Sequence, residues 1–194
     1  HERAHAATRA GKFRDQMVPI TADPDDPTGP VIDSDEGIRE HIDPAKMASL
    51  KAVFGADGRT TAANSSQISD GAAALLIADR EYAERNGLIP RARFRALSVA
   101  AADPIIQFTA ILDAAHKALG RSGLAVEEID LFEVNEAFAG VPLIFQREFG
   151  VPDDKLNVNG GSVALGHPLG STGARMLTDL LCELERSGKR FGLQ

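Results

Sequence analysis

Three short runs along the chain have the length and composition of β-strands. The run AAALLIA at 72–78 is continuously apolar, and IDLFEV at 129–134 is a similar run that ends at Asn135. Residues 93–99 (RFRALSV) are a third candidate. Strands of this kind, with few polar positions, are typical of a sheet that is covered on both faces.

Helical patterns lie between these runs. Asp43 before Pro44 predicts a helix to about Val53, because aspartate caps a helix and proline suits its first position. Asp79 caps another helix in the same way. Further helices are expected over 1–10, 109–120, 135–149 and 171–187, the last with apolar residues three or four apart at Ala174, Leu177, Leu181 and Leu184, while 20–31 is expected to be a surface loop. The alternation of strand and helix favours an α/β architecture with helices packed on a sheet.

Composition and charge limit the possible partners. The net charge of −7 argues against a nucleic-acid partner, because phosphate binding requires clustered lysine and arginine. A single cysteine cannot form an internal disulfide, and no apolar run approaches the about 18 residues of a membrane span. The first residues also have no apolar signal core. We therefore expect a protein of the cytoplasm, with no nucleic-acid or membrane partner.

The glycine-rich segment NVNGGSVALGHPLGSTGAR at 157–175 holds the first candidate for chemistry. Its glycines permit positive φ and the close approach of a ligand or a second backbone. His167 lies in this segment before Pro168, which keeps the histidine backbone extended. The start of the next helix would favour the neutral imidazole that a general base requires. The alternative is a packed loop histidine among turn glycines; a phosphate loop is disfavoured because its motifs are missing.

The second candidate is Asn135, in the sequence NEAFA at 135–139. It follows the predicted strand 129–134 directly, and ligands of open α/β sheets bind at the carboxyl ends of strands. Asn135 could instead serve only as the cap of the next helix. The two roles do not exclude each other.

These segments resemble signature blocks of the thiolase family, whose members make or cleave 3-ketoacyl-CoA by Claisen chemistry. The matching blocks follow one another in the family's order over nearly the whole chain: DEGIRE at 35–40, TTAANSSQISDGAAALLIADR at 60–80, IDLFEVNEAF at 129–138 and the segment 157–175. The resemblance implies a thiolase-like fold of layered α/β/α sheets, present here as an incomplete portion. Residues 1–90 would end the N-terminal domain with part of the loop region, and 91–194 would be a C-terminal domain truncated before its last strands.

The resemblance also implies a mechanism. In thiolases a cysteine of the N-terminal half is acylated; the residue matching His167 activates that thiol and polarises the thioester oxygen, and the residue matching Asn135 holds a water that completes the oxyanion site. A second cysteine, in a CxGGG-like block just beyond the position of Gln194, exchanges the α-proton. Neither cysteine is present, and Cys182 lies far along the predicted helix from His167. We expect this chain alone to be inactive; the alternative is a non-catalytic CoA-binding or scaffolding subunit.

Substrate contacts follow from the same resemblance. Ser66 matches a residue that touches the pantetheine arm of CoA, and Ala137 with Phe138 would border the acyl group. Gln67, at a position where biosynthetic members commonly have glycine, resembles the residue of the degradative branch of the family. CoA and acyl-CoA would be substrates, with no separate cofactor, and the full-length protein would form a homodimer or homotetramer. Residues 107–114 (QFTAILDA) depart from the family, which has a glycine- and proline-rich stretch there.

An unrelated motif occurs at the start of the chain. His1 to His5 spell H-E-x-x-H, the helix signature of zinc peptidases. Zinc requires a third protein ligand, which the motif does not identify, and thiolases have a similar histidine- and alanine-rich stretch here. We therefore expect no metal site.

Overall fold

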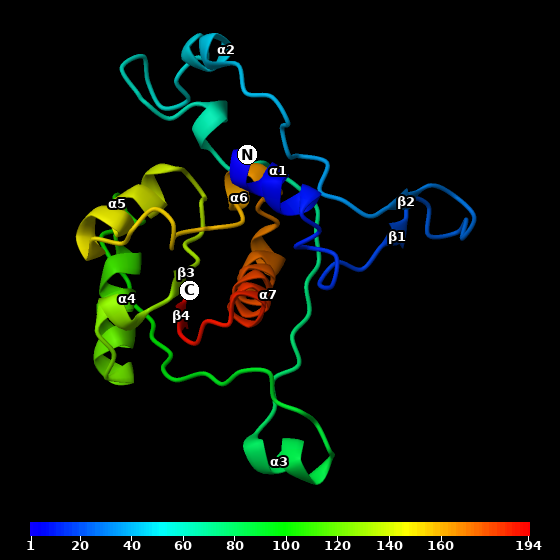
Figure 1. Ribbon diagram of the computed structural model, residues 1–194. Coiled ribbons are helices and arrows are strands. Elements are labelled where there is room, and N and C mark those ends of the chain that lie inside the picture. Colours follow the sequence, from blue (N-terminus) through cyan, green and yellow to red (C-terminus); the bar gives the residue numbers. More distant parts are fainter.

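The computed structural model describes all 194 residues, and most of its regular structure is helical (Figure 1). In chain order the elements are α1 (Glu2–Arg9), β1 (Ile20–Thr21), β2 (Val31–Ile32), α2 (Pro44–Ala48), the 3-10 turn η1 (Ala62–Asn64), α3 (Arg80–Arg85), α4 (Ala110–Ser122), the 3-10 turn η2 (Val126–Glu128), β3 (Leu131–Phe132), α5 (Gly140–Phe149), α6 (Ser162–Leu165), α7 (Leu169–Ser187) and β4 (Gly192–Leu193). The strands β1 and β2 form an antiparallel hairpin, and β3 pairs with β4 in parallel.

The main core surrounds β3. Phe132 of this strand and Phe145 of α5 are almost fully buried, with ring centroids 5.9 Å apart, and Ala115 brings α4 into the same cluster. The helix α7 contacts both strands, and a Cβ on Gly192 of β4 would lie 2.8 Å from the methyl carbons of Leu180. The strand pair therefore lies between the α4–α5 pair and α7 (Figure 1).

A second, smaller core joins α1 to the glycine-rich segment. Ala4 and Ala7 of α1 pack with Ala164 and Leu165 of α6. A Cβ on Gly160 would lie 2.7 Å from the Cβ of Ala4, and the φ of this glycine is +88°. Only glycine suits this position, because it combines the left-handed region with close contact to another helix. The helix α1 thus packs directly on the glycine-rich segment and holds it in place.

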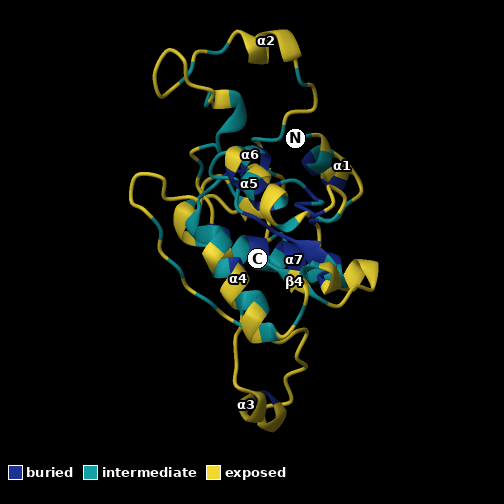
Figure 2. Cartoon of the chain, turned by 90° about the vertical axis from the view of Figure 1, so that its left-hand side faces the viewer, coloured by how far each residue is buried: buried dark blue, intermediate teal, exposed yellow.

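The predicted caps are confirmed. The Asp43 carboxylate accepts backbone hydrogen bonds at the start of α2, and Asp79 does the same at α3. Both helices project into solvent and are largely exposed (Figure 2). With no tertiary packing along it, α2 ends at Ala48, earlier than the predicted end near Val53.

The predictions of strands at 72–78 and 93–99 are wrong for this chain. Both segments lack regular structure, and Leu76 and Val99 are 82% and 88% exposed. A strand requires a neighbouring strand to bond its N–H and C=O groups, and neither segment has one here. The third predicted strand, 129–134, is confirmed only over Leu131–Phe132, where β4 and the chain near Leu156 supply neighbours.

Two helices differ from their predicted form. The helix predicted over 135–149 begins only at Gly140, because the preceding residues bond to other segments. In α7 the most buried side chains are not the predicted apolar positions. They are Thr172, Met176, Asp179, Leu180 and Glu183. The buried face of α7 thus carries several hydrogen-bonding groups, which the apolar pattern did not predict.

Candidate functional site

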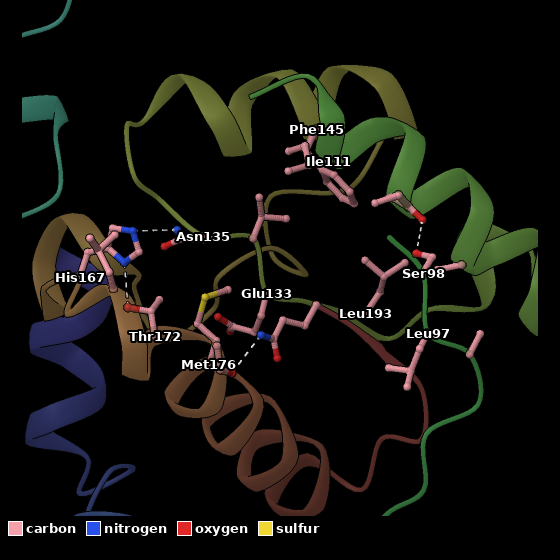
Figure 3. Close-up of a pocket in the computed structure, with 18 residues that line it drawn as sticks. Leu97, Ser98, Ile111, Glu133, Asn135, Phe145, His167, Thr172, Met176 and Leu193 are labelled. Atoms are coloured by element: carbon pink, nitrogen blue, oxygen red, sulfur yellow. Dashed lines mark hydrogen bonds between the residues drawn. The ribbon is translucent and has the colours of Figure 1, made fainter. Parts of the chain in front are cut away.

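His167 and Asn135 lie next to each other at the start of α7 (Figure 3). The Nε2 atom of His167 lies 3.3 Å from Nδ2 of Asn135, and its Nδ1 atom lies 2.7 Å from Oγ1 of Thr172, in the first turn of α7. The two predicted residues are 32 positions apart in sequence. The fold therefore brings the end of the β3 segment to the glycine-rich segment.

The backbone of His167 is held by a segment that precedes it by almost a hundred residues. Its N–H donates to Oγ of Ser69 at 3.0 Å and to the carbonyl of Gln67 at 3.2 Å. The Gln67 amide in turn donates to the carbonyls of Gly37 and Val163, at 3.0 and 3.1 Å. Gln67, which the sequence suggests as a mark of the degradative branch, thus ties three segments together around His167.

A buried serine orients the Asn135 amide from the side opposite His167. Oγ of Ser162 donates to Oδ1 of Asn135 at 2.7 Å, and Arg175 donates to the same Oγ at 3.2 Å. Arg175 forms an ion pair of 2.7 Å with Asp179, one turn further along α7. Asn135 therefore connects through Ser162 to a largely buried charged pair.

Glu136 fastens the loop after β3 to the glycine-rich segment. Its carboxylate accepts from Nδ2 of Asn157 at 2.8 Å and from the backbone N–H of Val163 at 3.1 Å. A Cβ on Gly161 would collide with this carboxylate, so glycine is required for the approach. The glycine-rich sequence allowed the close approach of either a ligand or another part of the chain. At Gly160 and Gly161 the neighbouring atoms belong to the chain itself.

The environment of His167 favours its neutral form. Burial lowers the pKa of His167 below its usual value, and the nearby positive charge of Arg175 lowers the same pKa further. The direction agrees with the neutral imidazole predicted from the helix start, but its causes are burial and Arg175. A neutral imidazole can accept a proton near pH 7, as a general base requires.

The three predicted substrate-contact residues also lie together. The N–H of Ser66 donates to the carbonyl of Ala137 at 3.0 Å, and the neighbouring Ser65 bridges to Phe138. The Phe138 ring packs edge-on against Phe108, with centroids 5.4 Å apart. Phe108 belongs to the stretch 107–114 that departs from the family, and this contact was not predicted from the sequence.

A cavity of about 430 Å³ opens beside Asn135 and His167 (Figure 3). Asn135 and His167 line it together with Glu133, and its other walls come from residues of α4, α5, α7, β4 and the extended segment near Leu97. Cys182 does not line it; its sulfur lies 3.6 Å from a guanidinium nitrogen of Arg91. The only thiol of the chain is thus directed away from the candidate base.

The zinc-peptidase interpretation of His1 and His5 finds no support. Nδ1 of His1 accepts from the backbone N–H of Arg39, and Nε2 of His5 lies 3.8 Å from a carboxylate oxygen of Glu40. No group of three or more histidine, cysteine, aspartate or glutamate side chains is placed to hold a metal ion. None of the helices is both long enough and apolar enough for a membrane span.

Several residues of this site were not predicted from sequence. Ser162, Thr172 and Ser69 bond directly to Asn135 or His167. Two of them lie within the glycine-rich segment, so their nearness to His167 in sequence was the available signal. Ser69 had no such signal, because it lies 98 positions away from its partner.

Comparisons with known proteins match both parts of the chain. Residues 1–81 match the thiolase N-terminal domain and residues 88–194 match the thiolase C-terminal domain. The chain is 46% identical over 194 residues to steroid 3-ketoacyl-CoA thiolase FadA6 of Mycobacterium tuberculosis, covering 100% of this chain and 46% of that protein. It is 44% identical over 197 residues to a 3-ketoacyl-CoA thiolase of Serratia proteamaculans, with 100% and 51% covered. The chain spans about half the length of the curated relatives it matches.

Solved structures give the same result. The acetyl-CoA acetyltransferase of Bacillus anthracis superposes with a TM-score of 0.93 at 41% identity, covering 100% of this chain and 50% of that one. Human mitochondrial 3-ketoacyl-CoA thiolase in complex with CoA gives 0.89 at 34% identity, covering 98% and 47%. These likenesses confirm the predicted fold, a partial thiolase-like α/β fold. With both family domains matched along it, the chain belongs to the thiolase family.

Proposed function

We propose that this chain supplies the acid/base and oxyanion side of a thiolase active site, for thiolytic cleavage of 3-ketoacyl-CoA or the reverse Claisen condensation. The observation that supports this most directly is the contact of 3.3 Å between His167 and Asn135 in a cavity wall. The names of the relatives, 3-ketoacyl-CoA thiolase and acetyl-CoA acetyltransferase, support the same reaction class.

In the proposed cleavage, Nε2 of His167 takes the proton of a cysteine thiol. The thiolate attacks the 3-keto carbon, the C2–C3 bond breaks, and the electron pair of that bond passes to the thioester oxygen of the leaving acetyl-CoA enolate. The second amide hydrogen of Asn135 is free to hold a water near this oxygen. Donors aimed at such an oxyanion typically contribute about 3 to 4 kcal/mol each. A second thiol then protonates the α-carbon and becomes a thiolate. The thiol of a CoA molecule, losing its proton to that thiolate, attacks the acyl-cysteine; acyl-CoA forms, and the released cysteine recovers its proton from His167.

Neither thiol comes from Cys182, whose sulfur contacts Arg91. The 194 residues alone are therefore proposed to be inactive. For the domains we propose residues 1–90 and 91–194; the matched ranges 1–81 and 88–194 support a boundary in this region. For the complete protein we further propose a cytoplasmic homodimer or homotetramer, with CoA and acyl-CoA as substrates and no separate cofactor.

Ser66, Ala137 and Phe138 are proposed to contact the substrate. Their support is the pairing of the backbone at Ser66 with Ala137 and the packing of the half-buried Phe138 ring against the exposed rings of Phe108 and Phe54. A rigid apolar wall of this kind suits an acyl group, and backbone groups near Ser66 suit the amides of a pantetheine arm. The human thiolase with CoA bound is a similar structure in which this placement can be compared.

The test is a thiolysis assay of the complete encoded polypeptide, with whatever residues flank this chain, on a series of 3-ketoacyl-CoA substrates. Asn135→Ala should lower kcat by about 100- to 1,000-fold, the loss typical of one oxyanion donor. His167→Ala should lower it by about 100- to 10,000-fold, as for a general base.

Matched controls are His116→Ala and Asn86→Ala, which remove exposed residues bonded only to Glu148 and to the Tyr82 carbonyl. Both controls should keep full activity. Normal turnover of His167→Ala or Asn135→Ala would refute the assigned roles. CoA binding without any turnover of the parent protein would favour the alternative, a non-catalytic CoA-binding subunit.

A further inference from the structure

A buried hydroxyl group links the candidate oxyanion amide to a charged pair. Ser162 is 1% exposed, and its Oγ lies between Oδ1 of Asn135 at 2.7 Å and a guanidinium nitrogen of Arg175 at 3.2 Å. We propose that Ser162, with Arg175, is a positioning residue that fixes which way the Asn135 amide faces and, through it, which nitrogen of His167 carries the proton. The catalytic meaning of this inference rests on the proposed function.

The direction of each hydrogen bond follows from the available donors. A guanidinium group only donates, so Ser162 accepts from Arg175. The serine hydroxyl has a single proton, and Oδ1 of Asn135 is the acceptor within reach. The oxygen of the amide is therefore turned toward Ser162, and its NH2 group is turned toward His167.

The hydrogen bond on the Nδ1 side of the imidazole independently indicates that Nε2 is an acceptor. The Thr172 hydroxyl donates to the carbonyl of Pro168 at 2.9 Å, which uses its only proton. Thr172 must then accept from Nδ1 of His167, at 2.7 Å. Neutral His167 thus carries its proton on Nδ1, and the lone pair of Nε2 faces the NH2 group of Asn135. The hydrogen bonds thus form one chain in which each group donates to the next, in the order Arg175, Ser162, Asn135, His167 and Thr172.

The reversed amide is disfavoured as long as the serine is present. Turning Asn135 over would leave the proton of the buried Ser162 without an acceptor, and an unpaired buried polar group is costly. Without the hydroxyl this cost disappears, and Oδ1 of Asn135 can face Nε2. An oxygen there accepts from Nε2–H, so it would stabilise both the other neutral tautomer and the protonated imidazolium.

Arg175 is itself well fixed for this task. It forms an ion pair with the buried carboxylate of Asp179, which also accepts from the side chain of Gln16 at 2.5 Å. Because Thr172 and Arg175 lie one turn apart on α7, one rigid helix orients both ends of the chain of hydrogen bonds.

The experiment compares the parent with Ser162→Ala in the complete encoded polypeptide. Nitrogen-15 NMR of the His167 ring reports the tautomer, and a pH titration of the same signals reports the pKa. The parent should hold the Nδ1–H tautomer. In Ser162→Ala the Nε2–H fraction and the pKa of His167 should both rise. Two titratable or charged groups face the ring besides its own partners. Arg175 on α7 keeps its ion pair with Asp179 in this variant, and Glu133 in the same cavity is not substituted.

The control is Val163→Ala, which shortens the next side chain of α6 and keeps the backbone N–H that bonds Glu136. It should leave the tautomer and the pKa as in the parent. If Ser162→Ala does not fold, Ser162→Gly removes the same hydroxyl with less demand on space. An unchanged tautomer and pKa in the folded variant would overturn the inference.

Kinetics separates this inference from the proposed function. Ser162→Ala should lower kcat by less than the roughly 100-fold expected for loss of the amide itself, with little change in KM and with the pH profile shifted upward. If thiolysis is absent in the parent but the NMR changes occur, the proposed function fails and the positioning role stands. If turnover is normal and the NMR signals do not change, only the positioning role fails.

Discussion

Glu133 places a carboxyl group in the core two residues before Asn135. It is 5% exposed and lines the cavity beside Asn135 and His167. Burial raises the pKa of Glu133 well above its usual value, and the carboxylates of Asp179 and Glu136 raise it further, against the opposing effect of Arg175. The folded protein therefore keeps this group protonated over a pH range in which the unfolded chain ionises it.

This difference makes stability depend on pH in a direction that can be worked out. In the unfolded chain this group ionises near the ordinary pKa of glutamate, 4.5. Above that pH the unfolded chain binds fewer protons than the folded one, so stability is lost as pH rises. Between pH 4.5 and 7 the loss is at most 2.5 pH units at about 1.4 kcal/mol each, or roughly 3 to 4 kcal/mol. This is an upper limit because it applies only while the folded group stays fully protonated.

Glu133→Gln removes the titration and keeps the shape. Denaturant unfolding of both proteins from pH 4 to pH 8 should give a stability difference in favour of the variant that is smallest near pH 4. The difference should grow with pH by up to roughly 3 kcal/mol at pH 7. Asp179 and Asp35, whose pKa values burial also raises, are present in both proteins and largely cancel. A difference that stays constant across this range would refute the reasoning.

Two further predictions concern packing. Gly161→Ala should lower the free energy of unfolding by about 2 to 3 kcal/mol, because the new methyl group displaces the Glu136 carboxylate from its hydrogen bonds. The control, Gly170→Ala, has open space around it and should be neutral. Equal denaturation midpoints for the two variants would contradict this. Phe145→Ala should cost about 3 to 5 kcal/mol because its ring is buried in the main core, while exposed Phe94→Ala should change the melting temperature little.

The parts of the fold that depend on near neighbours were predicted from the sequence. The caps at Asp43 and Asp79 bond to groups two or three residues away, so the local sequence decides them. The strands predicted at 72–78 and 93–99 are different, because a strand forms only when another strand supplies its hydrogen bonds. An apolar run shows that a segment is suited to a buried sheet, but its partner cannot be read from the run itself.

In the candidate site, too, some features could be predicted from local sequence and others depend on residues far away in the chain. Its two central residues, Asn135 and His167, were predicted because each lies in a distinctive motif. The partners that orient them were not predicted. Ser162 and Ser69 are ordinary serines in sequence, and only the fold shows that one bonds the amide and the other the backbone of the histidine.

The buried face of α7 explains why the apolar pattern misjudged this helix. Thr172 and Arg175 orient the groups of the site, and Asp179 and Glu183 hold Arg175 and Lys12 by ion pairs. Between Thr172 and Glu183 the helix rises about 16 Å, so one rigid element carries all of these contacts. A helix used to position a site must turn polar groups inward, where most of them find a partner; the Nε atom of Arg175 is an exception. The rule that apolar residues mark the buried face therefore fails most where the helix serves the site.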